Sequence, residues 1–177
     1  MATEAESARV FFAAWPPPEV QQALGNIARQ AQGECGGRAV PASNIHLTLV
    51  FIGDVSRDRL AGLEALGAAL AAPRFSLVVD RLEYWRHNRI LWAGVGECPQ
   101  ALRTLVERLQ EPVAAAGFRI ERRPYVPHVT LRRDARVAPA NTRIRVDWPV
   151  TELALVESAQ RGRARAYQVL RSWPLMG

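Results

Sequence analysis

The chain alternates short apolar runs with segments whose apolar residues recur every three or four positions. The run at residues 9–15 stops at three prolines, a pattern typical of a buried strand followed by the first turn of a helix. Helical spacing marks residues 18–33, 56–72 and 102–117, the last ended or kinked at Pro112. Strands are predicted at residues 45–52, 75–82, 90–95, 118–122, 128–132, 144–150, 153–157 and 166–173.

These elements follow the order β-α-β-α-β and then β-α-β-β with extra strands. A basic turn at residues 86–89 indicates a hairpin. Mixed elements joined by hairpin-like connections favour an α+β fold over a doubly wound sheet. The second half repeats the helix, loop and strand of the first. We therefore expect residues 1–177 to form one domain of two similar lobes, roughly 1–90 and 91–177, with strand exchange at the C-terminus.

Composition narrows the class of protein. Of 177 residues, 49% are hydrophobic, enough for a folded core. All 23 basic residues are arginine, and the net charge is +6. A basic surface favours polyanions, and arginine binds phosphate in bidentate fashion; coding bias explains the absence of lysine equally well.

The acidic start, the lack of a long apolar stretch and the isolated Cys35 and Cys98 predict a cytoplasmic protein with reduced thiols, not a membrane protein.

Two copies of the pattern His-x-Thr-x carry the candidate chemistry. The first begins at His46 and the second at His128, about half the chain apart, and they contain two of the three histidines. Because side chains alternate along a strand, His46 and Thr48 are expected to share one face, as are His128 and Thr130. A single strand histidine is usually structural, but two in matched contexts point to paired function.

Two imidazoles and two hydroxyls in one cleft suit a phosphodiester. One neutral imidazole serves as base and the other, protonated, as acid. Threonine hydroxyls donate hydrogen bonds to the non-bridging oxygens. No metal or other cofactor is needed. A two-histidine zinc site is the competing interpretation, yet the sequence contains neither an HExxH motif nor a Cys/His cluster.

With these motifs the chain resembles the 2H phosphoesterase superfamily, and within it the RNA 2′,3′-cyclic phosphodiesterases, also called 2′-5′ RNA ligases. The resemblance spans nearly the whole chain and rests on the strand at 9–13, on residues 44–53 and 127–133, and on residues 155–158 with Gly162 and Tyr167. It implies a bilobal, pseudo-duplicated α+β fold, with two antiparallel-rich sheets flanking a central cleft and helices outside. It also implies metal-independent opening of an RNA 2′,3′-cyclic phosphate to a 2′-phosphomonoester.

By this similarity His46 is the proton donor and His128 the proton acceptor, an order that the near-symmetric motifs do not fix. Thr48, Thr130 and an arginine five residues after the second histidine, Arg133, are the implied substrate ligands. Strict alternation instead places Arg132 on the His128 face, unless the strand ends or bulges at residues 131–132.

Two aromatic residues are candidates for stacking on a nucleobase. Tyr125 is one; Phe51 is the other, although alternation assigns Phe51 to the core. The partner expected is RNA with a 2′,3′-cyclic phosphate terminus, and nothing demands more than a monomer. Two alternatives stay open: a phosphodiesterase for small cyclic or 2′-5′-linked nucleotides, and an RNA-binding module without turnover.

Overall fold

The computed structural model describes residues 6–177, and over this range the strands form two four-stranded sheets and one two-stranded sheet, all antiparallel. The elements in chain order are β1 (Ser7–Ala14), α1 (Pro18–Gln30), α2 (Gln32–Cys35), β2 (Arg38–Ala39), η1 (Ala42–Asn44), β3 (Leu47–Ser56), η2 (Arg57–Arg59), α3 (Leu60–Ala69), β4 (Phe75–Val79), β5 (Arg81–Trp85), β6 (Ile90–Gly94), α4 (Gln100–Ala115), β7 (His128–Arg133), β8 (Val146–Val150), β9 (Glu152–Arg161) and β10 (Ala164–Pro174).

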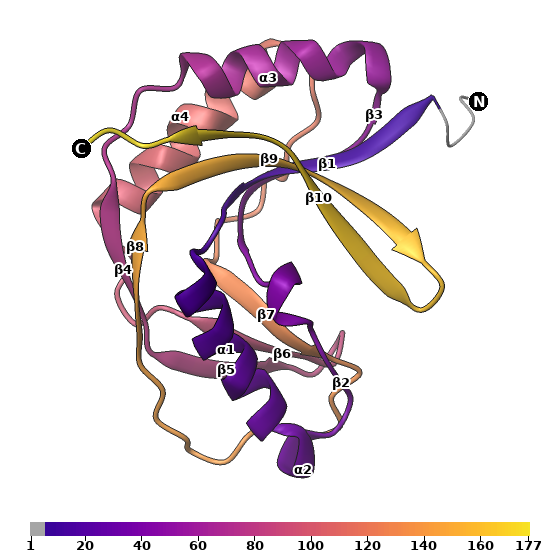
Figure 1. Cartoon of the computed structure of the whole chain (residues 1–177), viewed down its shortest axis with the longest axis vertical. Coiled ribbons are helices and arrows are strands. Elements are labelled where there is room, and N and C mark those ends of the chain that lie inside the picture. The colour runs from indigo at the N-terminus through magenta and orange to yellow at the C-terminus, as the bar shows by residue number, and fades with distance from the viewer. Residues whose placement is uncertain (1–5) are drawn as a thin grey trace.

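Each four-stranded sheet is covered by helices on its outer side. The first sheet has the order β10-β9-β1-β3, and α3 and α4 pack on it at the upper edge of Figure 1. The second has the order β2-β7-β6-β5, and α1 packs on it in the lower part of the same view. The predicted α+β architecture, with helices outside two antiparallel sheets, is confirmed.

The lobes do not follow the two halves of the sequence. Residue 90 begins β6, inside the β5–β6 hairpin, so the expected boundary falls within the second sheet. The first sheet takes β1 and β3 from one half and β9 and β10 from the other, while β4 pairs with β8. Strand exchange is therefore wider than a C-terminal swap. That residues 1–177 act as one domain stays a prediction. Most of the acidic start of the sequence falls in residues 1–5, which lie outside the described range.

Several local predictions are corrected by the structure. Residues 75–82 form two strands that belong to different sheets, because the chain changes sheet at Asp80. Residues 118–122 are not a strand, and α4 continues through Pro112 to Ala115. Strand β3 does not end at Gly53; it runs on to Ser56 with Gly53 at φ +89°, a conformation that glycine adopts without strain. Both cysteines are free thiols, as expected.

Candidate active site

Residue His46 enters the cleft from the segment between η1 and β3. The neighbouring Ile45 and Leu47 are fully buried, and they fix the backbone on either side of the ring. The His46 Nδ1 lies 2.7 Å from the carbonyl oxygen of Asn44. A carbonyl only accepts, so this nitrogen carries the hydrogen and donates it. Nε2 is then the nitrogen that accepts or releases a proton in the cleft.

The second histidine repeats this geometry from the other sheet. His128 begins β7, and its Nδ1 donates to the carbonyl of Val126 at 2.8 Å. In both motifs the acceptor is the carbonyl two residues before the histidine, so the two rings are held in the same tautomer when neutral. The local duplication inferred from the His-x-Thr pattern thus extends to the hydrogen bond that orients each ring.

Aromatic rings fix the two imidazoles from behind. The His46 ring stacks at 4.9 Å from the Phe11 ring and at 5.7 Å, nearly parallel, from Trp15, while Tyr167 meets its edge at 4.9 Å. The His128 ring has Trp85 at 4.8 Å, edge to face. Sequence reasoning missed the two tryptophans, because Trp15 and His46, and likewise Trp85 and His128, are far apart in sequence and meet only in the folded chain.

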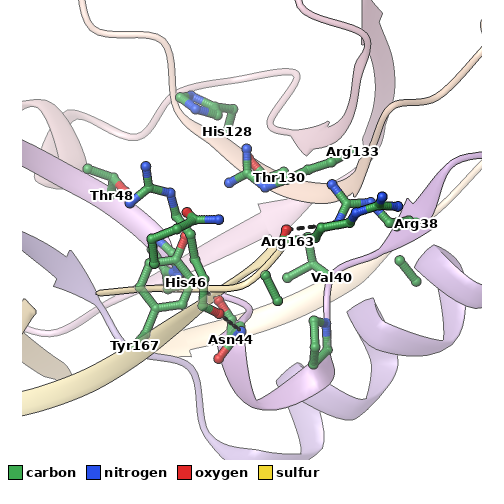
Figure 2. A pocket seen from close by; sticks show the side chains of 15 residues that line it. Arg38, Val40, Asn44, His46, Thr48, His128, Thr130, Arg133, Arg163 and Tyr167 are labelled. Carbon is green, nitrogen blue, oxygen red and sulfur yellow. Dashed lines mark hydrogen bonds between the residues drawn. The ribbon is translucent and has the colours of Figure 1, made fainter. Parts of the chain in front are cut away.

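One cavity of about 170 Å³ brings the predicted residues together. His46 and Thr48 line it from one lobe, and His128 and Thr130 from the other, while Arg133 lies at its edge (Figure 2). The two threonines lie between the two histidines in this view. The remaining walls are contributed by Arg38, Ala39, Val40, Pro41, Asn44, Gln160, Arg163, Ala164, Arg165 and Tyr167.

A β-bulge decides which of the two arginines reaches this cavity. In the β6–β7 pair, Leu91 is opposite Arg132 but Trp92 is opposite Thr130, so Leu131 is an extra residue in β7. After the bulge, Arg132 turns into the protein and is fully buried, whereas Arg133 returns to the face of His128 and lines the cavity. Strict alternation therefore misplaces Arg132.

The guanidinium of Arg132 is occupied by backbone carbonyls. It donates to Ala28 and Gly36 at 2.6 Å each and to Gly37 at 2.7 Å, with Gln32 Oε1 at 3.3 Å. These acceptors belong to the last turns of α1, to Gln32 at the start of α2 and to the Gly36–Gly37 turn. Arg132, the phosphate ligand that strict alternation favours over Arg133, is thus not available to substrate; it ties the α1–β2 connection to β7.

Neither Tyr125 nor Phe51 lines the catalytic cavity, but both border a larger cavity next to it. The Tyr125 hydroxyl donates to the carbonyl of Thr48 at 2.8 Å, and burial raises the pKa of Tyr125. Phe51 is 39% exposed, contrary to its predicted core position. A bulge in β3 explains the difference: Val50 is opposite Phe12 but Thr48 is opposite Ala13, so Leu49 is the extra residue, and Val50 is buried in place of Phe51.

The β9–β10 hairpin reaches across to the other lobe beside this cavity. Arg38 donates to the carbonyl of Arg163 at 2.8 Å (Figure 2), and Asn44 donates to the carbonyl of Arg165 at 3.0 Å. The run of arginines at residues 161–165 therefore adds positive charge to the cavity rim. Together with Arg133, these side chains favour an anionic ligand.

Burial makes both histidines weaker bases than a free imidazole. Desolvation lowers the pKa of His46 to about 4; the hydrogen bond to Asn44 opposes this, while the nearby Arg133 and His128 add to it. Desolvation also lowers the pKa of His128. In the unliganded protein at pH 7 both rings are neutral, and a bound phosphate anion would restore a proton to one of them.

The lowered pKa values of the two histidines predict an acidic optimum for kcat/KM, because kcat/KM reports the ionisation of the unliganded enzyme. Catalysis by one acid and one base needs a singly protonated pair, and with both values lowered that form is most populated below pH 6.5. Raising the pH through neutrality removes the required proton, so kcat/KM should fall. A profile of initial rates from pH 4 to 9 tests this; a maximum above pH 7.5 would contradict it.

A cleft between two antiparallel sheets, with a tautomer-matched histidine and a threonine from each, defines a phosphoesterase of the paired-histidine type. Comparison with known proteins agrees. The model of the family described as LigT like Phosphoesterase matches residues 15–92 and 94–165. The chain belongs to this family.

Similar proteins cover nearly the whole chain. The RNA 2′,3′-cyclic phosphodiesterase of Escherichia coli strain K12 is 35% identical over 96% of this chain and 98% of its own length. The protein of that name from Thermus thermophilus is 32% identical over 96% and 91%. The crystal structure of E. coli LigT complexed with 3′-AMP superimposes with a TM-score of 0.88 at 32% identity, covering 97% of this chain and all of that one.

Two further findings concern metal and membrane. Across residues 6–177 no three His, Cys, Asp or Glu side chains lie together as a metal-binding group. In the same range no helix has the length and apolar character needed to cross a bilayer.

Proposed function

We propose that this protein hydrolyses RNA ends that carry a 2′,3′-cyclic phosphate to 2′-phosphomonoesters, by two-histidine acid–base catalysis without a metal. The single observation that carries the proposal is the pair of histidines with matching Nδ1 hydrogen bonds on either lobe of one cavity. The names of the relatives supply the substrate class. The proposal includes that the protein is a monomer and acts on RNA in the cytoplasm. It also includes 2′-5′ ligation, which is the same chemistry with an RNA hydroxyl in place of water.

The proposed step is an in-line displacement at phosphorus. Nε2 of His128 takes a proton from water, whose oxygen bonds to phosphorus. The bond from phosphorus to O3′ breaks, and Nε2 of His46 donates its proton to that oxygen. The phosphate stays on O2′. The assignment of donor and acceptor follows the family resemblance, since the two rings have equivalent surroundings in hydrogen bonding.

Thr48, Thr130 and Arg133 are proposed to hold the non-bridging oxygens. Their side chains lie on the cavity faces of β3 and β7, between or beside the histidines. Charge builds on these oxygens as water attacks, and preorganised donors stabilise it without reorganisation. The Arg133 guanidinium supplies the positive charge, and the two threonine hydroxyls donate hydrogen bonds that orient the phosphate.

Replacing Arg133 with glutamine should lower kcat/KM by about 10- to 100-fold, because a hydrogen bond to a charged group contributes about 1.5–3 kcal/mol. Arg119→Gln is the matched control: it removes the same charge from an exposed position outside both cavities. Equal kcat/KM values for the two variants, measured on one cyclic-phosphate oligonucleotide, would remove Arg133 from the proposed ligands.

The direct test offers the wild-type protein three substrates in the presence of EDTA. These are an oligonucleotide ending in a 2′,3′-cyclic phosphate, a 2′,3′-cyclic mononucleotide and a 2′-5′-linked dinucleotide. Turnover of the oligonucleotide supports the proposal. Turnover of the small nucleotides alone favours the small-nucleotide alternative. Binding of the oligonucleotide with no product from any substrate favours the RNA-binding module.

A further inference from the structure

The catalytic cavity carries more positive charge than the proposed reaction uses. Its lining includes the four arginines Arg38, Arg133, Arg163 and Arg165, and no aspartate or glutamate of the described residues. Arg38 is paired with Asp134 at 2.8 Å, whereas the other three form no ion pair with a carboxylate within residues 6–177. A cyclic phosphate has a single negative charge, and Arg133 is already assigned to it. Arg163 and Arg165 therefore remain for a second anion.

The tight turn of the β9–β10 hairpin brings these two arginines to the cavity. Arg161 pairs with Ala164, so Gly162 and Arg163 are the two turn residues. Gly162 has φ +62°, and a glycine with positive φ at the first position of a two-residue turn suits the twist of the flanking strands. Arg165 follows directly after the turn and also lines the cavity. A single hairpin therefore supplies both arginines.

Two hydrogen bonds fix the hairpin backbone relative to the catalytic histidine. Arg38 donates to the carbonyl of Arg163 at 2.8 Å (Figure 2), and Asn44 donates to the carbonyl of Arg165 at 3.0 Å. The carbonyl of Asn44 in turn accepts the hydrogen of His46 Nδ1. Because these bonds use only the backbone carbonyls of the hairpin arginines, their guanidinium groups are left to bind a ligand.

The guanidinium of Arg165 is oriented without losing its charge. Its Nη1 donates to Oγ of Ser158 at 3.0 Å, and Ser158 is only 8% exposed. A hydroxyl accepts this hydrogen bond but neutralises no charge, and a guanidinium has five N–H donors. The charge of Arg165 and most of its donors are thus available to a phosphate, and the buried hydroxyl holds them in place.

The position of Arg165 along β10 suits a phosphate next to the reacting one. Tyr167, two residues further along the strand, has its ring 4.9 Å from the His46 ring. Two residues of an extended strand span about 6.6 Å. This distance is comparable with the separation of neighbouring phosphates in an RNA strand. One RNA strand can therefore present its reacting phosphate to the histidines and its next phosphate to Arg165.

We infer that Arg163 and Arg165 bind the phosphodiester on the 5′ side of the reacting nucleotide, the group that joins this nucleotide to the rest of the RNA. The inference rests on the proposed function, because it takes the histidine pair as the position of the cyclic phosphate. It makes the hairpin a determinant of specificity. An RNA end has this second phosphate, whereas a nucleoside 2′,3′-cyclic phosphate does not.

The test compares adenosine 2′,3′-cyclic phosphate with the same compound carrying a methyl phosphodiester on its 5′ oxygen. Both open the same ring, so the ratio of their kcat/KM values isolates the contribution of the 5′ phosphodiester. For wild type we expect this ratio to be about tenfold or more, the usual effect of a hydrogen bond to a charged group. Arg163→Gln and Arg165→Gln should each reduce the ratio several-fold. Arg161→Gln removes the same charge from an exposed position of the same hairpin outside both cavities, and should keep it.

A third compound, with a phosphomonoester on the 5′ oxygen, separates an RNA linkage from the 5′ phosphate of a mononucleotide. Faster opening of the monoester alone would overturn the inference. A diester ratio near one, a ratio unaffected by both cavity variants, or an equal loss in Arg161→Gln would also overturn it. In each of these cases the ring is still opened, and the proposed function stands. If wild type opens none of the three compounds, the proposed function fails, and this inference fails with it.

Discussion

Replacing His46 or His128 with alanine is expected to lower kcat for opening of an RNA 2′,3′-cyclic phosphate by about 10²–10⁴-fold, the usual contribution of a positioned acid or base. The two rings work on one transition state. The double variant should therefore be little slower than either single variant. Single-turnover rates on a labelled oligonucleotide measure the effect on chemistry without product release.

An asparagine variant at each position controls for folding. Its side-chain amide is placed to donate to the carbonyls that now accept from Nδ1, those of Asn44 and Val126, but it transfers no proton. We expect His46→Asn and His128→Asn to be as inactive as the alanine variants, with thermal midpoints closer to wild type. A single variant of either kind that keeps a tenth of wild-type kcat would exclude its histidine as acid or base.

Replacing Arg132 with methionine is expected to reduce the free energy of unfolding by about 3–5 kcal/mol, since removing one partner of a buried charged network leaves the others unpaired. Methionine fills similar space but leaves the carbonyls of Ala28, Gly36 and Gly37 without their donor. Urea denaturation at pH 7 measures the change.

The neighbouring Arg133→Met is the control for this stability prediction. Its side chain is half-buried and lines the cavity, so its removal should change the free energy of unfolding by less than about 1 kcal/mol. Activity should show the opposite pattern, with Arg133→Met impaired at temperatures where both variants are folded. Equal urea midpoints for the two variants would contradict the structural role of Arg132.

The alternation of side chains along strands was enough to predict the core of the site. His46 with Thr48, and His128 with Thr130, lie on common faces because no bulge separates the members of either pair. The α+β class also followed from the sequence, since hairpin turns and helical spacing are local signals. Site chemistry that depends on residues two positions apart is thus readable without a structure.

What alternation did not predict depends on single-residue bulges. An extra residue at Leu131 turns Arg132 inward, and another at Leu49 turns Phe51 outward; neither is marked by glycine at that position. The exchange of strands between lobes was likewise hidden, because pairing between β4 and β8 joins segments about 70 residues apart and no local pattern records it. The larger cavity is likewise lined by segments far apart in sequence, namely β3, the β5–β6 hairpin and the loop before β7.

The central claim is that water opens the cyclic phosphate at the bond to O3′, through two histidines and without a metal. The most direct measurement runs wild type on a cyclic-phosphate oligonucleotide in ¹⁸O-labelled water with EDTA, and resolves the product by mass and by the position of its phosphate. We predict one ¹⁸O atom in a 2′-phosphomonoester. A 3′-phosphate, or no hydrolysis until a divalent metal is restored, would contradict the account.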